Sequence, residues 1–357
     1  MNTTDLTGAF PRVQLRPGYS ISQVIKGGWQ LAGGHGAVDE NRAIEDMKTF
    51  VQAGITSFDC ADIYTGVEAL IGKFLDRNAD AFKSGDLPPV QIHTKCVPDL
   101  DLLPNLAKAH VENIIDRSLR RLGVERLDLV QFHWWDFNIP GYEKLAQYLA
   151  DIQKSGKIRY LGATNTDSRH LAPILESGIE VISNQVQYSV LDRRPEGDFP
   201  NLCLQYNLRF LSYGALAGGF LTDKYLGASE PKEPFENRSL TKYKLIIDDF
   251  GGWDLFQELL KRLRMVADQY NVGIAEVAAR YVLQKPFVAG VIIGARHSGH
   301  LENLRKIGGF ELSSDSIKDI MEIVDQSTGP IGSIYELERD RTGRHGMIIK
   351  YNLNSTE

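Results

Sequence analysis

Short apolar runs alternate along the chain with segments in which apolar residues recur at helical spacing, at intervals of roughly 25 to 35 residues. Parallel strands need helical crossovers of about this length, so the pattern predicts a repeated strand–helix unit. Strands are expected at Gln23–Lys26, Thr56–Asp59, Val90–Lys95, Asp128–His133, Ile158–Ala163, Val181–Gln185, Arg209–Tyr213 and Val288–Ile293.

The segment Asn105–Leu122 is typical of the predicted crossover helices. Its apolar residues, Val111 and Ile114 among them, share one face, whereas its arginines lie largely off that face. Gly123 supplies a C-terminal stop. The helix is therefore expected to pack on the strand that follows it.

Two stretches interrupt the repeat. Thr222–Trp253 is rich in proline, glycine and charge, and loops of that length are usually functional lids or disordered. Two helical segments follow, Asp254–Tyr270 and Ile274–Gln284, where the repeat needs one, so an extra helix is expected there.

The second interruption is the chain beyond Ser313. A helix is expected near Ser314–Gln326, and the final apolar run of the tail indicates that the tail packs on the protein. Two charged runs, Lys261–Arg264 and Leu337–Arg341, are interpreted as solvated faces.

Eight strand–helix units in about 290 residues, without a break in composition, favour one closed (β/α)8 barrel, an α/β fold. The alternative is an open doubly wound sheet, but the glycines of Gly27–Gly36 lack the dinucleotide-binding spacing that such a sheet requires. We expect a single domain over residues 1–357, with the barrel at about 21–310 and a C-terminal helix and tail at 311–357.

Composition narrows the choice of partners. The 357 residues carry 40 lysines and arginines against 46 acidic residues, a formal charge of -6, so a nucleic acid or an anionic membrane surface is not an expected partner. The N-terminus lacks the apolar core of a signal peptide, and we expect a cytoplasmic protein. The three cysteines lie far apart, which argues against disulfides and a zinc site.

Barrel active sites lie at the carboxyl ends of the strands, so the polar residues found there are candidates for catalysis. These candidates are Asp59, Tyr64, Lys95, His133, Asn165 and Gln185. Because side chains alternate along a strand, Cys60 and Cys96 are expected to face the helical layer as packing residues.

Such a cluster can protonate an oxygen that is becoming an alkoxide. A lysine beside a tyrosine stabilises phenolate, so Lys95 is expected to lower the pKa of Tyr64. Asp59 then holds Lys95 in place, and His133 is expected to donate a hydrogen bond to a substrate carbonyl. No residue is a good electron source, so reduction requires a cofactor such as nicotinamide.

These residues resemble the aldo-keto reductase family. The stretch Gly54–Gly72 is similar to the family signature, with Thr65 inserted after the tyrosine, while Ile92–Cys96 and Leu127–Asp136 are similar to the strands that bear the lysine and the histidine. The resemblance implies NAD(P)H-dependent reduction of an aldehyde or ketone. It also implies a catalytic tetrad, namely Tyr64 as the general acid with His133, Lys95 and Asp59.

The resemblance also implies cofactor contacts. Thr164 and Asn165 occupy the positions of the pair that binds the nicotinamide carboxamide, Gln185 matches a further contact, and Tyr213 lies where the family stacks an aromatic ring. The adenosine-phosphate motif appears as Ile292–Asn303, one residue shorter and without its lysine, which leaves Arg296 and His300 as its cations.

Arg296 is nevertheless suited to a phosphate near a helix N-terminus, so NADPH is the expected cofactor, with NADH possible. Asn303, at the end of the same motif, is a further candidate contact. The expected partner is a small-molecule carbonyl substrate, with Trp29, Trp134 and Trp253 as candidate residues of an apolar mouth. The sequence does not indicate an oligomeric state.

Two other functions stay open. One is a cofactor-binding sensor or accessory subunit that has this fold and little turnover. The other is a barrel hydrolase with a metal at His133 and Asp136, although two ligands three residues apart at a strand end point in different directions.

Overall fold

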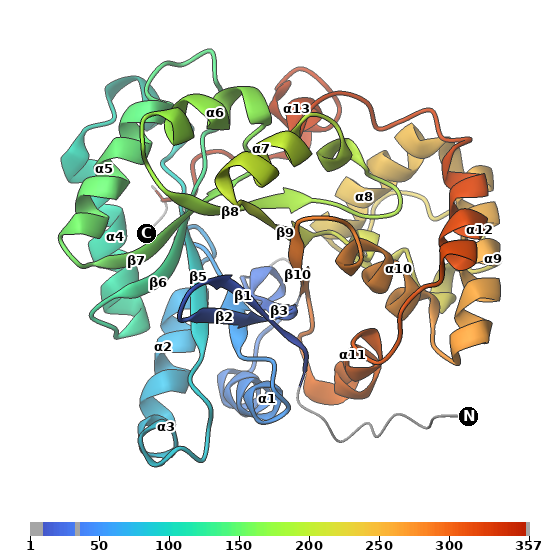
Figure 1. Cartoon of the computed structure of the whole chain (residues 1–357), viewed down its shortest axis with the longest axis horizontal. Helices are drawn as coiled ribbons and strands as arrows, with labels where there is room; N and C mark the ends of the chain where they lie inside the picture. The colour runs from blue at the N-terminus through green and yellow to red at the C-terminus, as the bar shows by residue number, and fades with distance from the viewer. Residues whose placement is uncertain (1–9, 33–35, 355–357) are drawn as a thin grey trace.

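The computed structural model describes residues 10–32 and 36–354, which fold around a closed barrel of parallel strands (Figure 1). The strands follow one another around the barrel in the order β10-β3-β4-β5-β6-β7-β8-β9. Their bounds are β3 (Val24–Gly27), β4 (Ser57–Asp59), β5 (Gln91–Cys96), β6 (Leu127–Phe132), β7 (Ile158–Thr164), β8 (Val181–Gln187), β9 (Arg209–Tyr213) and β10 (Val288–Ile293). The predicted (β/α)8 fold is therefore confirmed, as are all eight predicted strands.

Helices surround the barrel. The α-helices are α1 (Glu40–Gln52), α2 (Val67–Arg77), α3 (Ala79–Ser84), α4 (Lys108–Leu122), α5 (Tyr142–Lys154), α6 (Ser168–Glu176), α7 (Phe199–Tyr206), α8 (Arg238–Phe250), α9 (Gly252–Tyr270), α10 (Ile274–Leu283), α11 (Leu301–Ile307), α12 (Ser314–Val324) and α13 (Glu336–Arg339). Short 3-10 helices are η1 (Trp29–Leu31), η2 (Leu100–Asn105), η3 (Arg194–Glu196), η4 (Ala217–Gly219), η5 (Asp223–Tyr225), η6 (Ser298–His300) and η7 (Gly346–Ile348).

Helix α4 begins three residues later than the sequence predicts. Asn105 is the last residue of the 3-10 helix η2, and Leu106 and Ala107 are extended. The α-helix therefore begins only at Lys108. The C-terminal stop is confirmed, since Gly123 adopts the left-handed conformation (φ 67°) that favours glycine.

An antiparallel hairpin that the sequence analysis missed closes the amino-terminal end of the barrel. It consists of β1 (Arg12–Arg16) and β2 (Tyr19–Ser22). Leu15 and Ile21 of the hairpin pack in one buried cluster with Leu129 and Leu211 from inside the barrel. The hairpin thus fills the end of the barrel opposite the carboxyl ends of the strands.

A buried histidine links this hairpin to the barrel. His93 of β5 is fully buried, and its Nε2 lies 3.0 Å from the Tyr19 hydroxyl. Burial, together with the charge of Lys95, lowers the pKa of His93 from 6.5 to about 3. His93 is therefore neutral in the folded protein at pH 7.

We expect this histidine to make the fold sensitive to acid. Below pH 6.5 the unfolded chain binds a proton at this residue, whereas folded His93 binds one only near pH 3, so stability falls across that window as the pH falls. One such proton contributes a slope of about 1.4 kcal/mol per pH unit. We expect the free energy of unfolding to fall less between pH 7 and pH 5 for His93→Gln than for the unmodified protein, as measured by denaturant unfolding at the two pH values. Equal losses would contradict the assignment.

The chain between β9 and β10 holds more helix than predicted. The segment 222–253 contains η5 and α8, so it is not a disordered loop. Helix α8 forms because Leu240, Ile247 and Phe250 share a buried face, and because the side chain of Asn237 accepts a hydrogen bond from the Leu240 N–H at its start. Helices α8, α9 and α10 therefore stand where the repeat needs one helix.

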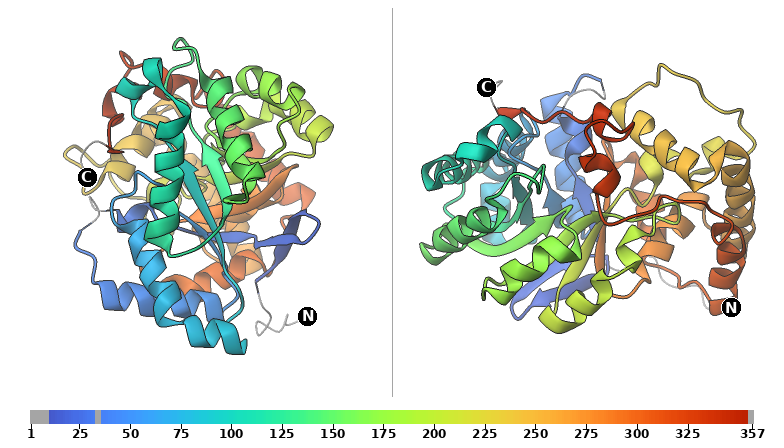
Figure 2. Two further views of the ribbon diagram at one scale, coloured as in Figure 1. Left: turned by 90° about the vertical axis from the view of Figure 1, so that its left-hand side faces the viewer. Right: turned by 90° about the horizontal axis from the view of Figure 1, so that it is seen from above.

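The C-terminal tail packs on the protein, as predicted. After α12 it passes through α13 and crosses to the side of the barrel where α4 and α5 lie (Figure 2). Tyr351 packs edge-on against Trp135, with ring centres 5.2 Å apart. The interpretation of Leu337–Arg341 as a solvated face is wrong, because the side chain of Glu338 is 1% exposed and Arg339 is bonded inside the protein.

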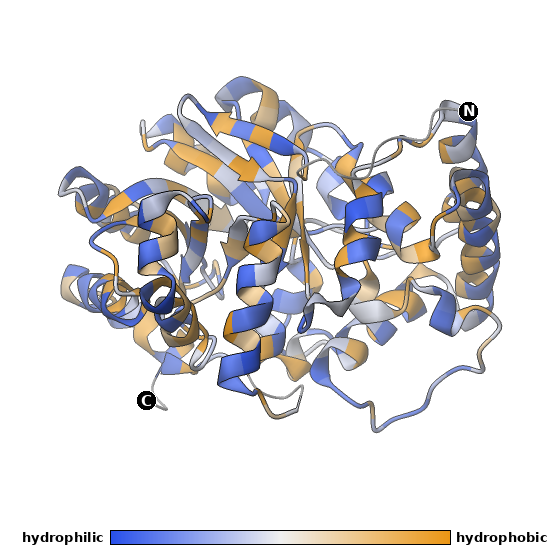
Figure 3. Ribbon diagram, turned by 90° about the horizontal axis from the view of Figure 1, so that it is seen from below, coloured by the Kyte–Doolittle hydropathy of each residue, from blue (hydrophilic) through white to orange (hydrophobic). Residues whose placement is uncertain are grey.

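The main core lies between the barrel and its helices. Figure 3 shows hydrophobic residues along the strands and mixed surfaces on the helices. Cys60 and Cys96 are completely buried in this outer core, as expected for packing residues. None of the helices that residues 10–32 and 36–354 form is long and apolar enough to cross a membrane.

Candidate active site

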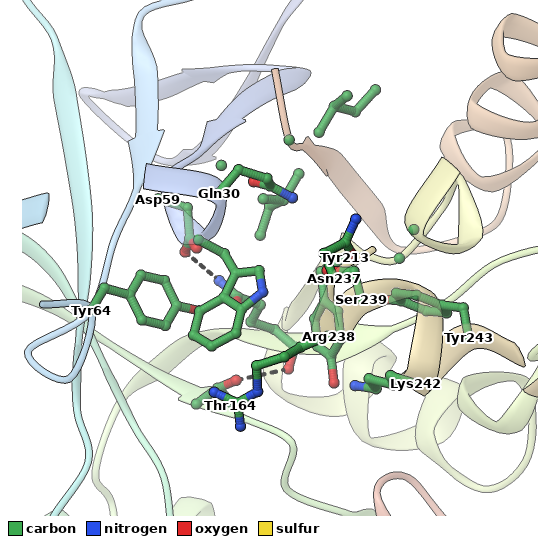
Figure 4. A pocket seen from close by; sticks show the side chains of 18 of the residues that line it. Gln30, Asp59, Tyr64, Thr164, Tyr213, Asn237, Arg238, Ser239, Lys242 and Tyr243 are labelled. Carbon is green, nitrogen blue, oxygen red and sulfur yellow. Dashed lines mark hydrogen bonds between the residues drawn. The ribbon is translucent and has the colours of Figure 1, made fainter. Parts of the chain in front are cut away.

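A cavity of about 620 Å³ opens at the carboxyl ends of the barrel strands. Strand ends, the loop after β10, α8 and the C-terminal tail all contribute to its walls (Figure 4). The residues that the sequence singled out and that line this cavity include Trp29, Asp59, Tyr64, Lys95, His133, Thr164, Asn165, Gln185, Tyr213 and Arg296. His300, the second cation of the short motif, also lines it.

A buried ion pair lies at the bottom of the cavity. The Lys95 ammonium donates to both carboxylate oxygens of Asp59, at 2.9 and 2.8 Å, and to the main-chain oxygen of Cys60 at 2.8 Å. Both charged side chains are about 5% exposed. Burial disfavours the ammonium, but the negative charge and hydrogen bonds of Asp59, joined at high pH by the Tyr64 phenolate, outweigh it and raise the pKa of Lys95 above its ordinary value.

Tyr64 stands beside this pair in a tight turn between β4 and α2. Gly66 permits the turn by adopting a left-handed conformation (φ 77°), and α2 starts directly after it. The Lys95 ammonium lies 5.0 Å from the centre of the Tyr64 ring. Burial raises the pKa of Tyr64, and the charge of Lys95 opposes this rise only in part. The expectation of a lowered pKa is therefore wrong for the free site, and Tyr64 is protonated at pH 7.

His133 is also buried, and one of its ring nitrogens already has a main-chain partner. Nδ1 lies 3.3 Å from the main-chain oxygen of Thr164, which can only accept a hydrogen bond, so the neutral ring carries its proton on Nδ1. Burial and the charge of Arg339 lower the pKa of His133 to about 3. Nε2, which has no partner among the described residues, is then an acceptor and not the expected donor.

Two amide side chains, Gln185 and Asn165, lie beside the Asp59–Lys95 pair and His133, and existing hydrogen bonds fix which of their ends donates and which accepts. Gln185 uses its amide nitrogen on Asp59, at 2.6 Å, and on Gln131, at 3.1 Å, which leaves its side-chain oxygen to accept. The side-chain oxygen of Asn165 accepts from the Tyr213 hydroxyl at 2.8 Å, which leaves its amide nitrogen to donate. This pair fits a carboxamide, which offers one acceptor and one donating NH₂ group.

The cavity walls carry positive charge. Arg238 and Lys242 of α8 line them, with Arg238 5.8 Å from the centre of the Trp29 ring and Lys242 4.9 Å from that of Tyr213, and Arg296 lines them from the loop after β10. Asp59 is the one carboxylate among the described lining residues and is paired with Lys95. Such a surplus of cations in a chain of formal charge -6 favours an anionic ligand. The sequence analysis missed Arg238 and Lys242, although the spacing of Leu240, Ile247 and Phe250 was a usable signal for their helix.

Buried charges hold the loop that carries Arg296. The Lys26 ammonium donates to the Ala295 oxygen at 3.2 Å, and Asp46 accepts from the Ser298 N–H at 2.9 Å. Arg296 itself donates to the Ala37 oxygen at 2.6 Å. Asn303 lies on the exposed side of α11 and does not line the cavity, so the structure does not support it as a cofactor contact.

The tryptophans are arranged differently from the expectation. Trp29 lines the cavity, with its ring 5.1 Å from that of Tyr64. Trp134 does not line it, because its indole N–H donates to the main-chain oxygens of Asp136 and Ile139, and Trp135 lines the cavity instead. Trp253 packs against Phe256 outside the cavity. The substrate-side prediction is therefore wrong for Trp134 and Trp253.

The cavity wall beside His133 comes from the tail. Tyr335 stands edge-on to His133, with ring centres 5.5 Å apart, and Ile348 and Ile349 lie further along the same wall. No local sequence signal could have identified these residues. Among residues 10–32 and 36–354, no group of three histidine, cysteine or acidic residues is arranged to hold a metal, including around His133 and Asp136.

Comparisons with known proteins agree with this geometry. Residues 23–325 match the model of the Aldo/keto reductase family. The chain is 26% identical to Aldo-keto reductase YhdN of Bacillus subtilis, over 88% of this chain and 94% of that protein. It is 26% identical to an NADH-specific methylglyoxal reductase of Escherichia coli, over 83% and 88% of the two chains. A glycerol dehydrogenase structure from Gluconobacter oxydans has the same fold, with a TM-score of 0.71, 22% identity and coverage of 88% of this chain and 95% of that one.

Proposed function

The chain belongs to the aldo/keto reductase family, and we propose that it reduces an aldehyde or ketone to an alcohol with NADPH, with Tyr64 as the proton donor. Family membership by itself supports oxidoreductase activity on carbonyl compounds with a nicotinamide cofactor. The observation that carries the finer proposal is that one cavity combines a buried Asp59–Lys95–Tyr64 group with a surplus of cations in its walls.

Tyr64 is the group suited to protonate the substrate oxygen. Its phenol is protonated at pH 7, and the adjacent Lys95 ammonium stabilises the phenolate that remains once the proton has left. Asp59 keeps the ammonium in place, and Tyr64 is the described lining tyrosine whose ring the ammonium contacts. A bound nicotinamide coenzyme supplies the hydride that no side chain can provide.

His133 has a role different from carbonyl polarisation. Its Nε2 can accept the hydrogen bond of the alcohol formed, while Nδ1 remains bonded to Thr164. The alcohol is thus held between Tyr64 and His133. Release of the product then breaks two hydrogen bonds without any change of charge on His133.

The chain can hold both ends of a dinucleotide. Asn165 and Gln185 match the acceptor and the donor of the carboxamide, and the Tyr213 ring is fixed beside them by its bond to Asn165. In the loop after β10, Arg296 and His300 line the cavity, and a phosphate of the coenzyme would lie against them. A guanidinium favours a 2′-phosphate over a 2′-hydroxyl, which supports NADPH over NADH.

The substrate side of the cavity has largely apolar walls, with Arg238 over the Trp29 ring. Trp29, Trp135 and Tyr335 contribute aromatic rings, and Ile348 and Ile349 contribute aliphatic surface. These residues exclude water from the reacting oxygen, which strengthens the interactions of Lys95 there. A carbonyl compound with an apolar body suits them better than a highly hydroxylated one.

A spectrophotometric screen tests the proposal. Purified protein is mixed with NADPH or NADH and a panel of aromatic aldehydes, aliphatic ketones, small dicarbonyls and sugars, and coenzyme oxidation is followed. We expect turnover with NADPH and at least one apolar carbonyl compound. Tight coenzyme binding without turnover for any member of the panel would favour the accessory-subunit alternative.

Arg296→Ala should change the affinity for NADPH more than the affinity for NADH. The loss of a charge-assisted hydrogen bond to a 2′-phosphate should weaken NADPH binding by about 1–3 kcal/mol and change NADH binding much less. Fluorescence titration gives both dissociation constants. Arg305→Ala is the matched control, because Arg305 lies on α11 and pairs with Glu302 outside the cavity. Equal losses for both coenzymes, or an NADH preference in the unmodified protein, would show that Arg296 does not bind this phosphate.

A further inference from the structure

Helix α13 lies beyond residue 325, where the family match ends, yet its last residue bonds to the candidate active site. The Nη2 atom of Arg339 donates to the main-chain oxygen of Asn165 at 2.5 Å and to that of Trp134 at 3.3 Å. Asn165 directly follows β7, and Trp134 follows His133 at the end of β6. One guanidinium therefore joins the ends of two neighbouring strands.

The guanidinium is held firmly in its own position. Its central carbon lies 4.2 Å from the centre of the Phe137 ring and 5.3 Å from that of Tyr335, so aromatic rings contact it from two elements. Its Nη1 atom donates to the main-chain oxygen of Ile334 at 3.3 Å. A planar group with several N–H bonds in fixed directions suits this arrangement, whereas an ammonium does not.

A buried ion network fixes the helix that carries Arg339. Glu338 accepts two hydrogen bonds from Arg194, at 2.9 and 3.0 Å, and Arg194 also bonds both carboxylate oxygens of Asp192. These three side chains are at most 2% exposed. Because an unpaired buried charge is costly, the network holds α13 against the chain that follows β8.

Asn165 is the residue that depends most on this contact. Its φ is 56°, the left-handed region that residues other than glycine seldom adopt. Its N–H donates to the Gln185 oxygen and its side-chain oxygen accepts from Tyr213, so Arg339 supplies the partner for its main-chain oxygen. The side-chain amide that faces the cavity is thereby fixed from three sides.

We propose that Arg339 is a positioning residue for the nicotinamide end of the coenzyme, because it bonds the main-chain oxygens of Asn165 and Trp134 and so sets the directions of the Asn165 amide and the His133 ring. This inference rests on the proposed function. It makes a segment outside the family match part of the coenzyme site. The adenosine end, for which Arg296 is the proposed contact, is not bonded to Arg339, whose hydrogen bonds go to the main-chain oxygens of Asn165, Trp134 and its own helix start.

Binding of two ligands distinguishes a positioning role of Arg339 from a general loss of structure in the variant. NADPH contains the nicotinamide, whereas adenosine 2′,5′-bisphosphate carries only the adenosine phosphates. We expect Arg339→Met to weaken NADPH binding about tenfold or more, the change that follows loss of a hydrogen bond to a charged group, and to leave binding of the bisphosphate unchanged. The kcat should fall, while the KM for the carbonyl compound changes less.

Thermal unfolding, monitored by circular dichroism, shows whether each variant is folded before binding is measured. If Arg339→Met does not fold, Arg339→Lys carries the same test, since it keeps the charge and the stem but cannot bond both oxygens in the same geometry. Arg264→Met is the matched control, because Arg264 lies on α9 and donates to the Val272 oxygen, away from the cavity. This control should bind both ligands as the unmodified protein does.

Equal weakening of both ligands, or no weakening of NADPH in the folded variant, would overturn the role of Arg339. Failure of the proposed function is seen separately, in the unmodified protein. If that protein neither binds NADPH nor oxidises it with any carbonyl compound, the coenzyme site itself is wrong. Binding of both ligands by the unmodified protein, with selective loss of NADPH in the variant, supports both inferences.

Discussion

Tyr64→Phe should lower the kcat for carbonyl reduction by about two orders of magnitude or more while NADPH binding stays unchanged. The substitution removes only the phenol oxygen. The ring contact with Trp29 and the ion pair of Lys95 with Asp59 remain, so neither folding nor the cavity should change. Steady-state rates and a fluorescence titration of NADPH measure the two effects separately.

The matched control is Tyr188→Phe, which removes a buried hydroxyl that donates to Glu196 outside the cavity. This control should retain the turnover of the unmodified protein. If Tyr64→Phe also retains it, Tyr64 is not the general acid, and another proton source must be sought. Loss of NADPH binding in Tyr64→Phe would instead assign the hydroxyl to coenzyme binding.

The barrel could be predicted because its strands are buried on both faces. A run such as Leu127–Phe132 is mostly apolar, with four apolar residues of six, and lies between helical segments, so local sequence identifies it. The β1–β2 hairpin was not predicted because its strands are only five and four residues long and β1 begins and ends with an arginine. Helix α8 was not predicted because proline and glycine precede it and obscure the apolar spacing within it.

The site residues on strands could be predicted for a related reason. The carboxyl ends of parallel strands meet at one end of a barrel, so Asp59, Lys95 and Gln185 had to lie close together. The prediction that Trp134 lines the cavity was wrong because β6 ends at Phe132. After that residue the alternation of a strand no longer sets the directions of the side chains. Contacts made by Tyr335 and Arg339 join residues about two hundred positions apart in sequence to the site, and no periodicity within the tail encodes them.

Lys95→Met should reduce both stability and activity, and the two losses have different causes. Removal of the ammonium leaves the Asp59 carboxylate buried with only amide partners, Gln185 and Gln131, which should lower the free energy of unfolding by about 3–5 kcal/mol. Activity should fall about as far as in Tyr64→Phe, since nothing stabilises the Tyr64 phenolate. Denaturant unfolding and steady-state kinetics measure these losses.

The double variant Lys95→Met with Asp59→Asn separates the two causes. It contains no unpaired buried charge, so most of the lost stability should return. Turnover should stay low, because the ammonium beside Tyr64 is still absent.

The pH dependence of the turnover that remains in the Lys95 variants provides a further test. Burial raises the pKa of Tyr64 and Lys95 opposes that rise, so without Lys95 the alkaline limb that reports the phenol should move to higher pH. Recovery of turnover together with stability, and an alkaline limb that does not move, would mean that Lys95 serves only as the structural partner of Asp59.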